Sequence, residues 1–303
     1  MNKVHNTAII DRTLLELSNA DLNIPNDEFL WMAECLIDMG ADFIAVNAKI
    51  KDKICMSWKK FSTIDLTEEF ITIYSDEINN ESLEKVRKFE KTEKVNIAGL
   101  SSCAPWQWEK YVGLLKKYIS VPVCICPSNR SGMASSTAVE AAAAGIEYVI
   151  TSFAGYGDNG GGAALEEVVM ALNLLYGINK KFNMVNIPKF IEVFEWVTGR
   201  EVPSQKPILG RDIFKCESGI HGDGILKKSS TYEPYPPELV GQKREFVIGK
   251  HSGKSMLKEK LRNLHIECND YEIASLMDKI KEKSMNGMRI DDNMLIKLVL
   301  SNV

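Results

Sequence analysis

The stretch VPVCICPSNRSGMASSTAVEAAAAGIEYVITSF, residues 121–153, holds two short apolar runs separated by a helical segment. The runs at 121–127 and 148–153 have the length and composition of buried strands, and the helix candidate at 137–144 ends at Gly145. A helix between two strands is the connection that joins parallel strands of one sheet. This unit therefore predicts an α/β fold with a parallel sheet covered by helices.

The same alternation extends over the first two thirds of the chain. Four more apolar runs predict strands, at 8–14, 42–47, 70–76 and 95–100. Three further segments predict helices, at 26–39, 80–91 and 106–118. A strand spacing of roughly 25 residues fits a TIM-type (β/α) barrel, but eight such units need about 250 residues and the alternation stops earlier. We therefore predict a degenerate or shortened barrel, with a doubly wound sheet as the alternative.

The alternation stops at residues 198–212, TGREVPSQKPILGRD, where Gly, Pro and polar residues replace it. Beyond this segment, stretches such as YEIASLMDKI carry apolar residues at three- and four-residue intervals, the period of an amphipathic helix. We predict a barrel domain at 1–200. Residues 201–303 are predicted to form a linker subdomain followed by a small C-terminal helical module.

Composition limits the class of protein. The chain is 45% hydrophobic and 26% charged, as in ordinary globular proteins, and no apolar run reaches the roughly 18 residues of a membrane-spanning helix. A net charge of -4 without a Lys/Arg-rich block argues against a nucleic-acid partner. Seven cysteines without paired spacing fit reduced thiols. We expect a cytoplasmic protein with no membrane or nucleic-acid partner.

Two motifs in the barrel domain suggest ligands, and each has a stronger structural interpretation. GYGDNG, residues 155–160, matches the dinucleotide fingerprint GxGxxG, but no acid follows about 20 residues later and the preceding strand is a late one. A tight loop at the barrel rim is the better interpretation. Cys124 and Cys126 share one face of a strand, but no second pair completes a soft-metal site, so both are expected to be buried core residues.

GIHGDG, residues 219–224, contains one of only four histidines. Gly219 and Gly222 remove bulk around His221 and let the backbone bend, as a catalytic loop requires. A histidine hydrogen-bonded within a turn explains the motif equally well. Tyr232 fits catalysis or aromatic packing, and His251 fits a helix cap or an anion contact. The residues alone leave the role of this segment open.

Five stretches together resemble the homocitrate synthase and isopropylmalate synthase family, metal-dependent barrel enzymes that condense acetyl-CoA with a 2-oxo acid. Residues 11–19, 126–132 and 157–163 resemble the family motifs DTTLRDGEQ, HCHNDLG and GERAGNA, and the stretches ESGIHGDGIL and IGKHSGK are nearly unaltered. The resemblance spans almost the whole chain. The chain most resembles the split homocitrate synthases of nitrogen fixation. The resemblance implies that it is the omega-type subunit, which corresponds to the C-terminal half of the undivided enzyme.

The resemblance implies that the departures from the family motifs fall on positions that orient the oxo acid or bind the metal. The arginine and aspartate of RDGEQ correspond to Leu15 and Glu16, the histidines of HCH to Cys126 and Ser128, and the asparagine of GERAGN to Gly162. A divalent metal needs several oxygen or imidazole ligands converging in one place. Glu16 alone cannot supply them. We therefore expect this chain to bind no metal or other cofactor.

The resemblance also implies that the proton-transfer residues of the family are retained. They correspond to His221 and Tyr232, and the family supplies them from a C-terminal subdomain to the barrel of a neighbouring subunit. The methyl group of acetyl-CoA must lose a proton, for which an imidazole is suited, and a phenol can donate a hydrogen bond to the new oxyanion. Glu217 and His251 are candidates for supporting this site.

These inferences lead us to expect a subunit of a heteromeric homocitrate synthase, inactive alone, that donates His221 and Tyr232 to a partner carrying the divalent metal. Acetyl-CoA and 2-oxoglutarate would meet at the shared site, and an isopropylmalate-type 2-oxo acid is the alternative. A second hypothesis makes the chain an inert structural or regulatory partner of such a synthase. A third makes it an independent lyase or aldolase built on Cys126, Arg130 and Glu16.

Overall fold

The computed structural model describes residues 7–53, 61–87, 94–288 and 290–301. The chain folds as two compact units, unit 1 up to Leu209 and unit 2 from Gly210 onward. This division lies inside the Pro- and Gly-rich segment 198–212, in which the predicted boundary after residue 200 also lies. No helix in the described part of the chain is long and apolar enough to cross a membrane.

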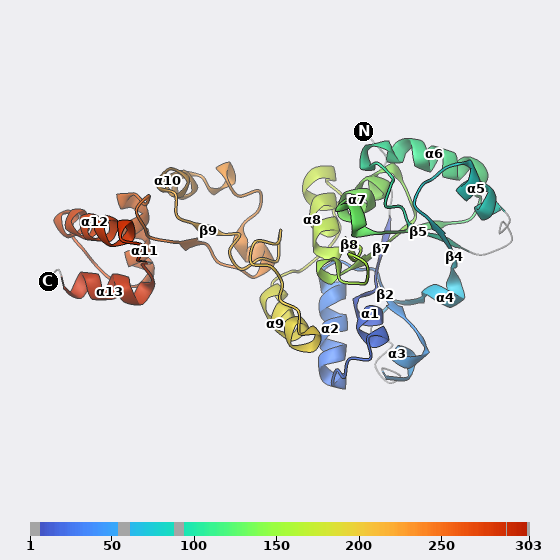
Figure 1. Ribbon diagram of the computed structural model, residues 1–303, viewed down its shortest axis with the longest axis horizontal. Coiled ribbons are helices and arrows are strands. Elements are labelled where there is room, and N and C mark those ends of the chain that lie inside the picture. The colour runs from blue at the N-terminus through green and yellow to red at the C-terminus, as the bar shows by residue number, and fades with distance from the viewer. Residues whose placement is uncertain (1–6, 54–60, 88–93, 289, 302–303) are drawn as a thin grey trace. The chain divides into compact units, whose positions relative to one another are not determined.

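Unit 1 is built on a parallel sheet with the strand order β3-β2-β1-β7-β6-β5-β4 (Figure 1). A two-residue strand, β8 (Ala163–Ala164), pairs with the end of β7. The seven longer strands are β1 (Ala8–Asp11), β2 (Phe43–Val46), β3 (Thr63–Asp65), β4 (Ile71–Ser75), β5 (Val95–Gly99), β6 (Val123–Pro127) and β7 (Tyr148–Ser152).

The strand order is that of a barrel opened at one seam. Strand β7 returns to pair with β1, with Ile9 opposite Val149, as the last and first strands of a barrel do. No pairing joins β3 and β4 in the residues that the structure describes. Only α4 (Leu66–Glu69) and Phe70 connect these strands, whereas a parallel crossover needs about a dozen residues. The sheet is therefore a curled half-barrel, which confirms the predicted shortened TIM-type fold.

Helices follow the strands and pack against the sheet, as α7 (Ala134–Ala144) illustrates. Its small buried alanines let the helix axis come close to β6 and β7. It ends at Gly145, whose φ of 95° is a left-handed conformation that glycine adopts without strain. The remaining α-helices are α1 (Thr13–Asn19), α2 (Asn26–Asp38), α3 (Ala48–Lys53), α5 (Asn80–Arg87), α6 (Trp108–Tyr118), α8 (Leu165–Tyr176) and α9 (Ile187–Thr198).

Alternate strand residues form one buried cluster within the half-barrel. Cys124 and Cys126 both belong to it, as the two-residue period of a strand requires. Both thiols are buried, which confirms their prediction as core residues. The other buried members of the cluster are Ile10, Ala45, Ile64, Phe70, Ala98 and Ile150.

The six strands expected from apolar runs are all present. The first ends at Asp11 instead of residue 14, because helix α1 begins at Thr13. Strand β3 was missed because it has only three residues, too few for a periodic pattern. The helix expected at 80–91 is seen as α5, and residues 88–91 lie outside the described residues.

Unit 2 combines a two-stranded parallel sheet with four α-helices in its described residues. Strands β9 (Lys215–Cys216) and β10 (Glu245–Phe246) pair in parallel. The helices are α10 (Gly219–Lys227), α11 (Lys254–Asn263), α12 (Asp270–Met285) and α13 (Asp292–Leu300), and the short 3-10 turns η5 (Ser229–Thr231) and η6 (Pro237–Val240) lie between α10 and β10.

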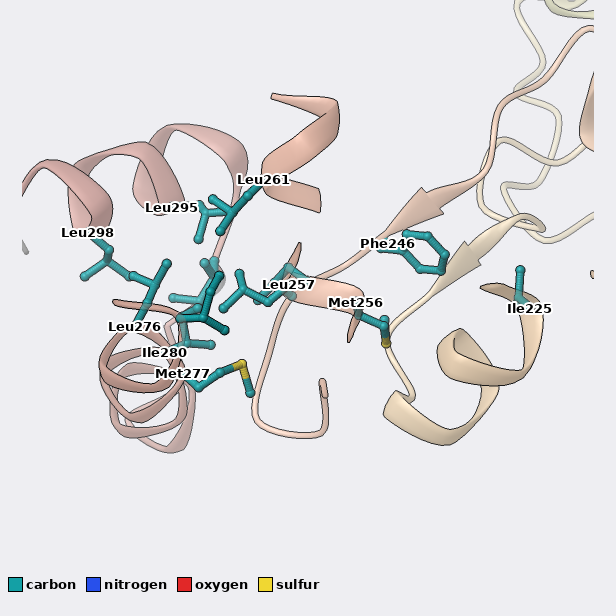
Figure 2. Close-up of a cluster of buried hydrophobic side chains, with 13 residues drawn as sticks. Ile225, Phe246, Met256, Leu257, Leu261, Leu276, Met277, Ile280, Leu295 and Leu298 are labelled. Atoms are coloured by element: carbon teal, nitrogen blue, oxygen red, sulfur yellow. The ribbon is translucent and has the colours of Figure 1, made fainter. Parts of the chain in front are cut away.

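Unit 2 has a hydrophobic core of its own (Figure 2). Met256 and Leu257 of α11 are fully buried, and Ile280 of α12 and Leu295 of α13 pack in the same cluster. Ile225 places α10 in this cluster as well. Because α10 carries the GIHGDG motif, packing against a helical core positions that motif.

Candidate functional site

A cleft of about 390 Å³ lies in unit 1 at the carboxyl ends of its strands. Active sites of TIM barrels lie at this face, because loops from several strands meet there. Two cationic side chains, Arg12 and Arg130, and two carboxylates, Asp76 and Asp158, line it. Its walls come from the ends of β1, β4, β5 and β6 and from the loop between β7 and β8. The remaining lining residues are Tyr74, Ser75, Ala98, Gly99, Cys126, Pro127, Ser128, Asn159 and Gly161.

Arg12 links several of the positions at which the sequence departs from its family. Its Nε lies 3.3 Å from Oε1 of Glu16, one helical turn later, and its Nη1 donates a hydrogen bond to Sγ of Cys126 at 3.3 Å. Burial raises the pKa of the Cys126 thiol, an effect that Arg12 partly opposes. The thiol is therefore protonated near neutral pH and is not a ready nucleophile.

The residues of this cleft do not fit a divalent metal. Cys126 offers a neutral buried thiol, Gly162 offers no side chain, and the Glu16 carboxylate is already paired with a guanidinium. Across the described ranges, no group of three or more His, Cys, Asp or Glu side chains has the arrangement of a metal site. The third hypothesis, a lyase that uses Cys126, receives no support from a buried protonated thiol.

The glycine-rich stretch 155–162 forms the loop between β7 and β8, at the rim of the half-barrel. Its neighbour Ser128 forms an isolated antiparallel bridge with Gly162. Gly157 and Gly161 both have positive φ, so the chain turns sharply over the cleft. This is the barrel-rim interpretation of the GxGxxG pattern.

Two buried carboxyl groups in unit 1 were not singled out from the sequence. Burial raises the pKa of Asp11 to about 6, although Thr13 and Thr151 stabilise its charged form by hydrogen bonds. Burial likewise raises the pKa of Glu166 to about 7, and Lys206, with Nζ 3.7 Å from Oε1, opposes the rise. Both follow from desolvation, which no local sequence pattern reveals.

In unit 2 the GIHGDG motif is the first part of helix α10, which corrects the expectation of a bend or catalytic loop. Ser218 caps the helix, because its Oγ accepts a hydrogen bond from the backbone N–H of His221. The glycines serve packing: a Cβ at Gly222 would lie 2.4 Å from Sδ of Met256 in α11. Without side chains at these positions, α10 can lie directly against α11.

The structure brings His221 and Tyr232 together. Their ring centroids lie 4.6 Å apart with an interplanar angle of 42°, and both side chains are exposed. Gly224, three residues after His221 on the same helix face, makes room for the tyrosine, since a Cβ there would lie 2.5 Å from Cε2 of Tyr232. The two aromatic groups thus form one exposed pair on unit 2.

The two supporting candidates lie near the start of α10. The carbonyl of His251 accepts a hydrogen bond from the N–H of Gly219, and Oε1 of Glu217 lies so close to Gly249 that a Cβ there would be 2.6 Å away. Both side chains are exposed. These contacts show how the ESGIHG and GKHSG stretches fit together.

The comparisons with known proteins agree with this architecture. A family model described as HMGL-like matches residues 34–193, and one described as homocitrate synthase post-HMGL domain-like matches residues 208–287. The homocitrate synthase omega subunit of Clostridium pasteurianum is 31% identical, over 96% of this chain and 94% of its own length. The 2-isopropylmalate synthase of Methanocaldococcus jannaschii is 38% identical over 59% of this chain and 35% of its own.

Among solved structures, an HMG-CoA lyase of Bacillus subtilis matches 67% of this chain and 96% of the lyase, with 15% identity and a TM-score of 0.44. The half-barrel and the two family matches together define the class, and the chain belongs to the HMGL-like family. Within it, the chain falls in the branch that contains the homocitrate and 2-isopropylmalate synthases. The alignment with the omega subunit spans 339 residues against 303 in this chain, so that relative carries segments without a counterpart here.

Proposed function

We propose that this chain is the non-metal subunit of a two-chain homocitrate synthase, which works in the cytoplasm with a metal-bearing partner subunit. The name of the Clostridium pasteurianum relative, an omega subunit, supports a synthase divided between chains. The reaction joins acetyl-CoA and 2-oxoglutarate to give homocitrate and CoA, with homocitrate supplied to the nitrogenase cofactor. An isopropylmalate-type 2-oxo acid is the alternative substrate.

The observation that carries the proposal is the exposed pair of His221 and Tyr232. The histidine and the tyrosine are in ring contact and both are open to solvent, and the histidine lies on a helix that a hydrophobic core holds in place. Tyr232 is 45% exposed, so part of its side chain is open to contact with another molecule. The pair is therefore suited to reach a substrate held by another polypeptide.

The chemistry assigns each side chain a task. The methyl carbon of acetyl-CoA must lose a proton before it can attack the ketone carbon of the 2-oxo acid, and the imidazole of His221 accepts or relays that proton. The phenol of Tyr232 donates a hydrogen bond to the ketone oxygen as negative charge develops there. The divalent metal expected in the partner would add positive charge at the same oxygen. Water then hydrolyses the thioester and releases CoA with a free thiol.

The test is reconstitution from purified chains. This chain, a partner with intact RDGEQ and HCHND motifs, and their mixture are assayed for thiol release from acetyl-CoA in the presence of 2-oxoglutarate. We expect turnover only in the mixture. His221→Ala should assemble normally and lose about 10²- to 10⁴-fold in turnover, the usual contribution of general acid–base catalysis.

The control variant is His265→Asn, which changes another exposed histidine of unit 2. His265 has a φ of 56°, a conformation that asparagine tolerates well, so the fold should be unaffected. Activity of this chain alone would refute the proposal that turnover requires both chains. Full activity of the His221→Ala mixture, together with normal assembly, would instead favour the inert structural partner.

A further inference from the structure

The cleft of unit 1 already contains a cation that belongs to the chain. Arg12 follows β1 directly, and its backbone N–H donates to the carbonyl of Thr151 at 2.9 Å, which fixes it at the carboxyl end of the sheet. Its side chain is 21% exposed and that of Glu16 is 20% exposed, so the charge pair is largely withdrawn from water. The ion pair of Arg12 and Glu16 is therefore held at a fixed position in the cleft.

Three of the positions that correspond to metal ligands in the family surround this one guanidinium. The Glu16 carboxylate forms an ion pair with Nε, Sγ of Cys126 accepts a hydrogen bond from Nη1, and Gly162 lies close to Nη2. A Cβ built on Gly162 would lie 3.3 Å from Nη2 and 3.3 Å from the carbonyl oxygen of Pro127. A side chain at position 162 would therefore crowd the guanidinium, which would have to shift by a few tenths of an ångström.

The rim loop between β7 and β8 contacts the same guanidinium at a second position, Gly157. A Cβ on Gly157 would also lie 3.3 Å from Nη2 of Arg12, so glycine at this position lets the rim loop lie against the guanidinium. Arg12, Cys126 and the rim loop are therefore packed as one assembly. The glycines at positions 157 and 162 thus leave the guanidinium of Arg12 the room that it uses.

We infer that Arg12 takes the place of a divalent cation in this cleft as the positively charged partner of the Glu16 carboxylate. A metal ion beside Glu16 would be repelled by the guanidinium and would have to displace it from the carboxylate. The inference concerns unit 1 alone. It stands or falls independently of His221, Tyr232 and a partner subunit.

The test asks whether Arg12 excludes metal even when ligands are supplied. Two variants of the full chain, free of affinity-tag histidines, are compared: Cys126→His with Ser128→His, and the same pair combined with Arg12→Thr. Each is titrated with Mn²⁺, and free Mn²⁺ is followed by electron paramagnetic resonance. We expect the variant without Arg12 to bind one Mn²⁺ at least about 100-fold more tightly, while the variant that keeps Arg12 behaves like the unchanged chain.

Adding Glu16→Gln to the variant without Arg12 should abolish its Mn²⁺ binding, because Glu16 is then the carboxylate ligand. Circular dichroism melts establish that each variant is folded. Equal Mn²⁺ binding with and without Arg12, whether both variants bind or neither does, overturns the inference. Mn²⁺ binding by the unchanged chain that depends on Glu16 overturns it as well.

A second measurement needs only a single substitution. Arg12→Thr should open a space beside Cys126 and Glu16 that takes up Cd²⁺, seen as an ultraviolet thiolate-to-cadmium band. The band should be absent from Arg12→Thr with Cys126→Ser, which corrects for the other cysteines. If the unchanged chain shows the same Cys126-dependent band, Arg12 does not exclude metal.

Discussion

His221 and Tyr232 lie with their ring centroids 4.6 Å apart on the exposed side of helix α10, although eleven positions separate them in the sequence. The turn η5 brings the chain back after the helix, and Gly224 leaves the tyrosine ring a place to lie. Two residues that the sequence marked as candidates thus form one structural pair.

Tyr232→Phe should separate the contribution of the hydroxyl from that of the ring. The ring contact with His221 is kept, so assembly with the partner and the melting temperature should not change. If the phenol stabilises an oxyanion, turnover of the reconstituted synthase should fall by about 10²- to 10³-fold. Steady-state thiol release gives kcat and KM. Unchanged kcat would assign Tyr232 to packing alone.

Gly224→Ala should disturb the pair although neither aromatic residue is substituted. The added methyl would lie 2.5 Å from Cε2 of Tyr232, so the ring must move away from His221. We expect turnover with the partner to fall at least tenfold while unit 2 stays folded. The fluorescence and near-ultraviolet dichroism of the tyrosines report the displacement, and thiol release reports the activity.

Gly113→Ala is the matched control, since Gly113 also lies inside a helix, α6, but nothing lies within 4 Å of a Cβ placed there. Replacing a helical glycine by alanine should raise stability by about 0.5–1 kcal/mol and leave turnover unchanged. A Gly224→Ala mixture that is as active as the control would show that the position of Tyr232 is unimportant.

Glu166→Gln should change how stability depends on pH. Burial raises the pKa of Glu166 to about 7, so the folded state holds the proton more tightly than the unfolded state does. Its contribution is therefore fully present below the unfolded pKa of about 4.5 and is lost as pH rises through 7. The difference in the free energy of unfolding between the variant and the unchanged chain should therefore shift in favour of the variant by on the order of 3 kcal/mol between pH 4.5 and pH 8.

Urea unfolding of both chains at several pH values measures this difference. Glu109→Gln is the control, because Glu109 is the second residue of α6 as Glu166 is of α8, but it is exposed. If the gain in stability with pH is no larger for Glu166→Gln than for Glu109→Gln, burial is not the cause of the titration.

Leu257→Ala should destabilise the core that holds α10. Leu257 is fully buried in α11, and removing a buried leucine side chain typically lowers the free energy of unfolding by about 2–5 kcal/mol. Leu300→Ala, at a side chain that is 71% exposed in α13, should change it by less than about 0.5 kcal/mol. Urea unfolding followed by circular dichroism compares the two, and similar values would contradict the assignment of this core.

Much of the fold was predictable because it is encoded in short-range patterns. Apolar runs marked six of the seven longer strands between Ala8 and Ser152, and Gly145 marked the end of α7, since burial and backbone conformation leave a local signature. The same local reasoning failed at GIHGDG. Three glycines in six residues indicate a bend, whereas the Ser218 cap and packing against Met256 hold the chain in a helix there.

The sequence by itself determined the parallel α/β class and the family resemblance, and that resemblance implies that ligand side chains are replaced at Cys126, Ser128 and Gly162. Tertiary structure alone decided that the half-barrel opens between β3 and β4, and that Arg12 reaches Cys126 across the sheet. The reason is that side-chain identity is local, whereas strand pairing and the reach of a long side chain depend on residues more than a hundred positions apart. For His221 and Tyr232 both contributed, since the sequence identified the two residues as candidates and the fold brought them into contact.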